Sequence, residues 1–395
     1  MEKGTRALQT NAAAVRNGWI WLFDRNINAL FRWEIASGRV EYVLSVRDEE
    51  AYQKSLFSDI FFYKNELFLV AFYAKKNVLI NLEDMSQKKV DCKRLDNLYH
   101  IKTDSSVQWG SKIYMFPKFW GDNIVVWDFE DNLFREIEVD YGTLSKHIQM
   151  REDRNTWCGG RIVNGEFWLA SRFATKIVRL NEQGDMNVYS VNTADVGFNR
   201  MNIWEDKFFL TPCGGRELIK FDIGTRKSKM MFQGDNLFSD QYFEPYGGIA
   251  IVDDMLVLLP FKTDQVVMLN LNTKEITKWD IGNVRFHTWV QVQEYIYMLP
   301  YLGNEICILN VKTGTITKRE CNRPLMYKGK DFYQYWMEEI SRLCGTEMIY
   351  SETVCNIEQF LESALISESN KNIQNSKRIG MKILETIQSS YNSNR

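Results

Sequence analysis

Basic side chains recur at similar positions along the chain, each shortly after an apolar segment. Arg25 follows Trp-Leu-Phe-Asp, and Arg172 follows Trp-Leu-Ala-Ser. Guanidinium and ammonium groups bind anions through charge-assisted hydrogen bonds. If folding brings these residues together, they form a site for a phosphate, a carboxylate or an acidic peptide; otherwise they are solvated loop residues without a common target. The full set is Arg25, Lys75, Lys76, Lys118, Arg172, Arg216 and Lys262.

A second group of side chains lies at the starts of other strand-like segments, and Trp120 lies beside Lys118 in one of the basic loops. The aromatic rings of this group can stack on a sugar or another ring, and its arginine adds a cation. For each tryptophan the alternative is packing between sheets. The members that we include in the candidate binding site are Trp120, Trp157, Arg200, Tyr246, His287 and Trp289.

Sequence signatures of catalysis are few. The three histidines, His100, His147 and His287, form neither an HxH nor an HExxH pattern, so we predict no metal site and no cofactor. No GxSxG nucleophile motif occurs. An enzyme that used a histidine as a base among cations would depend on His100, His287 and Arg200.

An internal repeat predicts how these residues are positioned. Each unit has an apolar residue late in one strand-like segment and, 11 or 12 residues later, a polar residue at the end of the next. The units are 40–53 residues apart, which matches a four-stranded propeller blade. The apolar positions are Leu22, Leu69, Phe116, Leu169, Leu210, Leu259 and Leu299; the polar positions are Glu34, Asn81, Asp128, Asn181, Asp222, Asn270 and Asn310.

Seven units of this length predict an all-β fold, a seven-bladed β-propeller, over residues 1–321. Blades pack face to face, so their strands are almost continuously apolar. The alternatives are a two-sheet sandwich and two small β domains, but the regular spacing argues against both. In a propeller the basic loops would lie at one mouth of the central channel, and acidic turns such as those at Glu66 and Glu166 would lie at the opposite end.

The repeats resemble those of known bacterial propellers. The segment Tyr297-Met-Leu-Pro-Tyr-Leu-Gly-Asn-Glu-Ile-Cys-Ile-Leu-Asn-Val-Lys-Thr-Gly is similar to YVTN-type and Kelch-like repeats. The likeness covers about residues 8–320. It implies the propeller fold and carries no implication for a ligand or a reaction.

Residues 322–395 follow the repeat and are predicted to form a helical extension. Segments 330–345, 351–369 and 378–390 place apolar residues at helical spacing. These helices either pack on the propeller or dock a partner protein. In the first segment the apolar face consists of Tyr333, Trp336, Ile340 and Leu343.

Composition limits the classes of function. With 49 Lys and Arg against 51 Asp and Glu, the net charge is −2, which excludes a uniformly basic nucleic-acid-binding protein. The seven cysteines are widely spaced and form no CxxC pair, which favours reduced thiols. Because no apolar run has the length of a signal peptide core or a membrane span, we expect a cytoplasmic protein.

These observations predict a cytosolic binding module. It would recognise an anionic ligand, a glycan or a protein partner at the basic mouth of the channel, and its tail would dock a partner. The alternative is a propeller lyase or hydrolase that acts on an anionic or glycan substrate.

Overall fold

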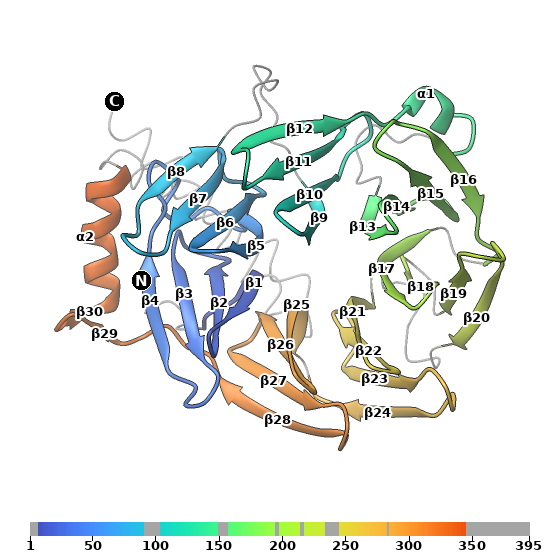
Figure 1. Cartoon of the computed structure of the whole chain (residues 1–395). Helices are drawn as coiled ribbons and strands as arrows, with labels where there is room; N and C mark the ends of the chain where they lie inside the picture. The colour runs from blue at the N-terminus through green and yellow to red at the C-terminus, as the bar shows by residue number, and fades with distance from the viewer. Residues whose placement is uncertain are drawn as a thin grey trace, which may run out of the picture.

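The computed structural model describes residues 7–90, 103–148, 157–193, 197–213, 217–233, 245–282 and 284–344. These residues form seven four-stranded antiparallel sheets arranged in a ring, a seven-bladed β-propeller (Figure 1). The predicted fold is confirmed. Each blade consists of four strands that are consecutive in the sequence.

The strands of each blade are given from the channel outward. Blades 1 to 3 contain β1 (Thr10–Arg16), β2 (Trp19–Asp24), β3 (Leu30–Glu34), β4 (Val40–Leu44); β5 (Phe57–Tyr63), β6 (Glu66–Ala71), β7 (Asn77–Asn81), β8 (Gln87–Val90); and β9 (Thr103–Trp109), β10 (Lys112–Pro117), β11 (Ile124–Asp128), β12 (Leu133–Ile137). Blades 4 and 5 contain β13 (Trp157–Val163), β14 (Glu166–Ser171), β15 (Lys176–Leu180), β16 (Met186–Ser190); and β17 (Phe198–Trp204), β18 (Lys207–Pro212), β19 (Glu217–Asp222), β20 (Ser228–Gln233).

Blades 6 and 7 complete the ring. They contain β21 (Tyr246–Val252), β22 (Met255–Pro260), β23 (Gln265–Asn270), β24 (Ile276–Asp280); and β25 (Arg285–Val292), β26 (Tyr295–Leu302), β27 (Glu305–Asn310), β28 (Thr315–Glu320). The other elements are α1 (Tyr141–Leu144), β29 (Met326–Tyr327), β30 (Lys330–Asp331) and α2 (Phe332–Cys344).

The first strand of each blade contacts the first strands of both neighbouring blades, and β25 contacts β1. The ring is therefore closed around a central channel. At one end, which we call the loop face, lie the starts of these inner strands and the loops between the second and third strands. At the other end, the turn face, lie the turns that join first to second and third to fourth strands.

Both faces of every blade are buried. Seven apolar clusters fill the seven spaces between neighbouring blades. Successive residues of one strand point into different clusters: Phe208 of β18 packs toward blade 4, and Phe209 packs toward blade 6. Because both sides of a strand need apolar residues, the strands are continuously apolar and do not alternate.

The two ends of the ring are joined by main-chain contacts and an ion pair. The Leu8 N–H donates to the Cys321 carbonyl at 2.9 Å, and Ala7 pairs with Asn322. Arg323 Nε and Nη2 then contact the two carboxylate oxygens of Asp24 at 2.6 and 3.0 Å. The Asp24 side chain is fully buried, so this bidentate pair links the end of blade 7 to blade 1.

Helix α2 packs against blade 1 (Figure 1). Phe332, Trp336 and Ile340 are buried in the cluster between blades 7 and 1. The Trp336 indole N–H donates to the Asn28 carbonyl at 3.2 Å. The helix therefore covers the outer side of blade 1.

The helix predicted at 330–345 is confirmed, with one correction to its apolar face. Tyr333 is 49% exposed, because the buried stripe passes through positions four residues apart that begin at Phe332. The predicted helices at 351–369 and 378–390 lie outside the described residues. Neither described helix is long and apolar enough to span a membrane.

Replacing Arg323 with alanine should destabilise the propeller, because buried Asp24 would lose both guanidinium contacts. Removing one partner of a buried ion pair costs about 3–5 kcal/mol. We expect a loss of this size in the free energy of unfolding, measured by urea denaturation.

The matched control is Lys330→Ala, which breaks a half-exposed ion pair with Glu338. It should cost less than about 1 kcal/mol. Equal losses in the two variants would contradict a role of Arg323 in closing the ring.

Candidate functional site

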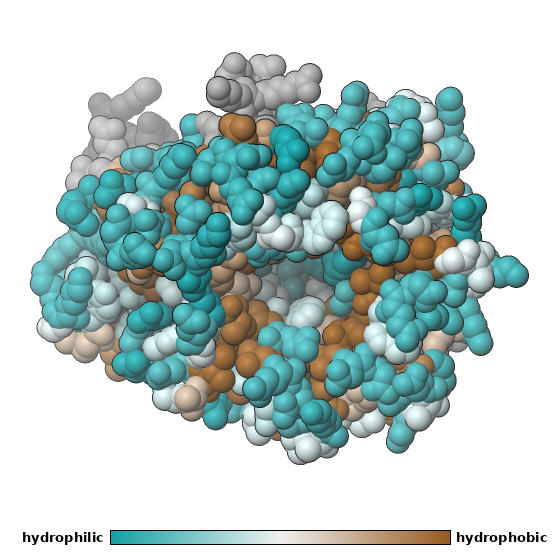
Figure 2. All heavy atoms as spheres, in the orientation of Figure 1, coloured by the Kyte–Doolittle hydropathy of each residue, from teal (hydrophilic) through white to brown (hydrophobic). Residues whose placement is uncertain are grey.

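A cavity of about 440 Å³ lies in the channel at the loop face. It is lined by inner strands and by loops that follow the second strands of several blades. Figure 2 shows that the molecule is hollowed at the centre of the ring. The closure of the ring thus creates one site from residues that are far apart in the sequence.

Positive charge exceeds negative charge in this cavity. Arg161 and Arg200 come from inner strands β13 and β17, and Lys118 and Arg172 come from the loops after β10 and β14. Asp59 of β5 is the only carboxylate among the described residues of the lining. The described part of the chain contains no cluster of three or more His, Cys, Asp or Glu side chains that could hold a metal ion.

Arg200 is held by three acceptors. Its Nε donates to the Gly247 carbonyl at 2.8 Å, and its Nη1 donates to the Asn199 carbonyl at 3.0 Å. Its Nη2 lies 2.5 Å from His287 Nε2. A guanidinium can only donate, so His287 Nε2 is the acceptor and, in a neutral ring, Nδ1 carries the hydrogen.

The charge state of His287 follows from its surroundings. Burial of the ring is the larger effect, and the nearby positive charges act in the same direction. Together they lower the pKa of His287 well below its usual value. The imidazole is therefore neutral at pH 7. The cations that contribute are Arg200, Lys118, Arg172 and Arg25.

Aromatic rings form one wall of the cavity and hold cations. The ring centroids of Phe261, His287 and Tyr301 are 5.2–5.7 Å apart. The Arg25 guanidinium lies 3.8 Å from the Tyr301 ring centroid, and Lys118 Nζ lies 4.2 Å from that of Phe72. Cation–π contacts of this kind orient a cation without supplying a full counter-charge.

The structure brings five predicted residues into the lining and places two beside it. Arg25 packs on Tyr301, which lines the cavity. Burial, Arg285 and Arg172 all lower the pKa of Lys262, so Lys262 belongs to the same positive region. The five residues of the lining are Lys118, Arg172, Arg200, His287 and Trp289.

The remaining predicted residues are placed elsewhere. Trp157 and Tyr246 are 0% and 2% exposed and pack in the clusters between blades, because the starts of inner strands also have to fill the core. Trp120 packs on Tyr141, with ring centroids 4.8 Å apart. Arg216 and His100 lie outside the described residues.

Arg161 and Tyr301 are two functional residues of the lining that were not predicted. Arg161 has the register position that Asn202 has in blade 5, and its Nε donates to Asn202 Oδ1 at 3.3 Å. Burial lowers the pKa of Arg161 to about 10. The signal that identifies it is a charged residue inside an inner strand. No sequence signal identifies Tyr301. Its loop has no basic residue, and its partner Arg25 belongs to another blade.

Lys75, one of the predicted basic residues, is bound by two residues of the preceding loop and does not line the cavity. Buried Glu49 accepts the Lys75 N–H with both carboxylate oxygens, at 3.1 and 3.0 Å. Lys75 Nζ donates to the Asp48 carbonyl at 2.9 Å. Burial raises the pKa of Glu49 to about 7.

Acidic turns lie at the turn face, as predicted, but basic partners neutralise some of them. Glu166 pairs with Arg179. Lys207 Nζ contacts Glu205 and Asp206 at 2.8 and 2.7 Å. Part of the negative charge of the turn face is therefore paired with basic residues of the same face.

No protein family model and no curated protein matches the sequence. Among solved structures, the chain is similar to a streptogramin B lyase with 10% identity and a TM-score of 0.58, over 76% of this chain and 93% of that one. It is also similar to a catalytically inactive virginiamycin B lyase from Staphylococcus aureus with quinupristin (13%, TM-score 0.57, 76% and 94%).

A third similar structure is YCF48 bound to a D1 peptide, with 11% identity and a TM-score of 0.55, over 83% of this chain and 96% of that one. All three identities are low. The likeness therefore supports the propeller fold and carries no statement about ligand or reaction.

The neutral state of His287 predicts a pH dependence of stability. In the unfolded chain the imidazole has its usual pKa of about 6.5, so below that pH the unfolded state binds a proton that the folded state does not. This contribution makes stability fall as the pH falls from 7 to 5.

His287→Gln should reduce the difference in Tm between pH 7 and pH 5, because glutamine does not titrate and still accepts a hydrogen bond. His147→Gln, at an exposed histidine, is the matched control and should leave the difference unchanged. The same pH dependence in wild type and His287→Gln would show that His287 is not buried in its neutral form.

Proposed function

We propose that this protein is a non-catalytic binding module that takes a small organic anion in the cavity at the loop face. The observation that carries the proposal is the set of four cationic side chains around about 440 Å³ with a single carboxylate among the described lining residues. A cavity of this size suits a small molecule. It also suits the end of an acidic peptide segment.

The electrostatics of the cavity favour an anion. Burial lowers the pKa of Arg161, and Arg200 lowers it further. The charged form of Arg161 is therefore destabilised in the cavity. A bound carboxylate or phosphate would offset this destabilisation and accept several hydrogen bonds. Such contacts are stronger in a partly buried site than in open water.

The aromatic wall indicates an organic anion. Phe261 and Tyr301 present ring surface beside the cations, and Trp289 also lines the cavity. An inorganic ion would use the charges and make no use of this ring surface. A ligand that has an acidic group and a flat or apolar body would use both.

The position of His287 favours binding over catalysis. A histidine acts as a general base through a nitrogen with a free lone pair. In this cavity the Nε2 lone pair accepts from Arg200, and Nδ1 carries the hydrogen. The alternative, a lyase or hydrolase in which His287 removes a proton, would need Arg200 to move away first.

The double variant Lys118→Glu/Arg172→Glu should weaken anion binding at least tenfold. A hydrogen bond to a charged group contributes about 1.5–3 kcal/mol, and about 1.4 kcal/mol is a factor of ten in Kd. The probes are citrate, phenyl phosphate and benzoate, titrated calorimetrically into the full chain at constant ionic strength.

The matched control is Lys227→Glu/Lys312→Glu, which makes the same change in net charge at exposed turns away from the cavity. It should bind the probes as wild type does. Equal weakening in both double variants, or no binding of any probe to wild type, would contradict the proposal. Turnover of a bound probe would favour the enzyme.

A further inference from the structure

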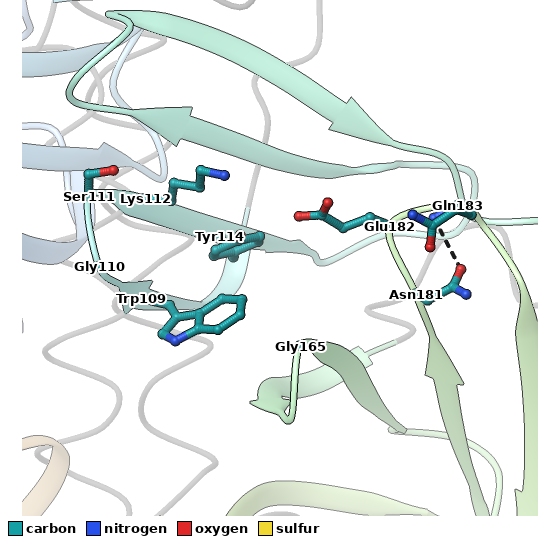
Figure 3. Close-up of a pocket in the computed structure, with 9 residues that line it drawn as sticks. All are labelled: Trp109, Gly110, Ser111, Lys112, Tyr114, Gly165, Asn181, Glu182 and Gln183. Carbon is teal, nitrogen blue, oxygen red and sulfur yellow. Dashed lines mark hydrogen bonds between the residues drawn. The ribbon is translucent and has the colours of Figure 1, made fainter.

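A second cavity, of about 500 Å³, lies at the turn face between blades 3 and 4 (Figure 3). Its residues come from two turns of blade 4 and from the turn between β9 and β10 in blade 3. It shares no lining residue with the cavity at the loop face. This second cavity is therefore independent of the proposed function.

An exposed tryptophan forms one side of this cavity. Trp109, the last residue of β9, is 52% exposed, whereas Trp33, Trp127 and Trp157 are fully buried. Its ring lies beside Tyr114, with centroids 6.2 Å apart at 41°.

Gly165 leaves room next to this indole ring. It has a positive φ of 79°, and a Cβ placed there would lie 3.8 Å from Trp109 Cη2. The turn therefore requires the glycine conformation, and the absence of a side chain keeps the edge of the ring accessible.

Three polar side chains of the cavity make no hydrogen bond in the described part of the chain, although Lys112 interacts electrostatically with Asp128, its neighbour across β10 and β11. The side chains of Lys112, Glu182 and Gln183 line the cavity and form no hydrogen bond or ion pair with another described residue. In Figure 3 Glu182 extends toward Tyr114. Asn181 Oδ1 accepts the Gln183 N–H at 3.1 Å, which holds this turn in place.

In blade 5 the lysine of the equivalent turn is paired with acidic residues of that turn. There the sequence Trp204-Glu-Asp-Lys replaces Trp109-Gly-Ser-Lys. Lys207 is paired with both acidic residues of its turn and lies 5.6 Å from the Trp204 ring centroid. In blade 3 a glycine and a serine stand in place of those acids, so Lys112 and Trp109 keep their binding capacity for an external molecule.

We propose that this cavity binds a neutral saccharide, with one pyranose ring on Trp109. The C–H groups of a sugar ring pack on the electron-rich face of an indole. The hydroxyls can accept from Lys112 and Gln183 and donate to Glu182.

Other ligand classes fit these residues less well. A cationic peptide would meet Lys112, and an anionic ligand would meet Glu182. An apolar ligand would bury the three polar side chains without hydrogen bonds, which is unfavourable.

The test uses the full chain and a panel of neutral trisaccharides: cellotriose, maltotriose and N-acetylchitotriose. Binding is followed by saturation-transfer NMR and by tryptophan fluorescence titration. We expect wild type to bind at least one of them, Trp109→Ala to weaken this binding at least tenfold with an unchanged Tm, and Trp109→Phe to retain part of it.

Trp204→Ala is the matched control, because Trp204 occupies the same turn position in blade 5. It should bind the saccharide as wild type does. The inference is overturned if no trisaccharide binds wild type at 10 mM, if Trp204→Ala loses as much affinity as Trp109→Ala, or if a lysine-rich peptide binds in place of the sugars and depends on Trp109. Failure here leaves anion binding at the loop face unaffected, since the two cavities share no residue.

Discussion

Burial of both faces of every blade against its neighbours is the interaction on which the rest of this structure depends. A four-stranded sheet with two apolar faces is not stable alone in water, so the seven blades persist only as a closed ring. The buried pair of Arg323 and Asp24 links the two ends of the ring, and α2 packs against blade 1 through Trp336. The geometry of both cavities follows from this ring.

Closure also concentrates charge. The inner strands converge on one channel, so Arg25 of blade 1 and His287 of blade 7 belong to the same site although they are far apart in the sequence. Burial, and after it the neighbouring positive charges, lower the pKa values of Arg161 and Lys262. Among the described residues of the lining, four cations thus face one carboxylate, and this excess of positive charge is the physical basis for binding an anion.

The repeated blades also allow one turn position to serve two purposes. In blade 5, Glu205 and Asp206 satisfy Lys207 within the turn. In blade 3, Gly110 and Ser111 cannot do so, and the carboxylate that lines the cavity, Glu182, is supplied by blade 4. A site therefore forms where a repeat departs from its neighbours, while the strands that position it stay the same.

The sequence by itself determined the fold and the end of the channel at which Lys118, Arg172, Arg200 and His287 gather, because strand spacing and loop position repeat along the chain. It could not separate rings that pack from rings that line a cavity: Trp157 is buried whereas Trp289 lines the channel. It also missed Arg161 and Tyr301. Those differences were decided only by the tertiary structure, because the direction of a side chain and its partners on other blades depend on how the closed ring sets the register and twist of each strand.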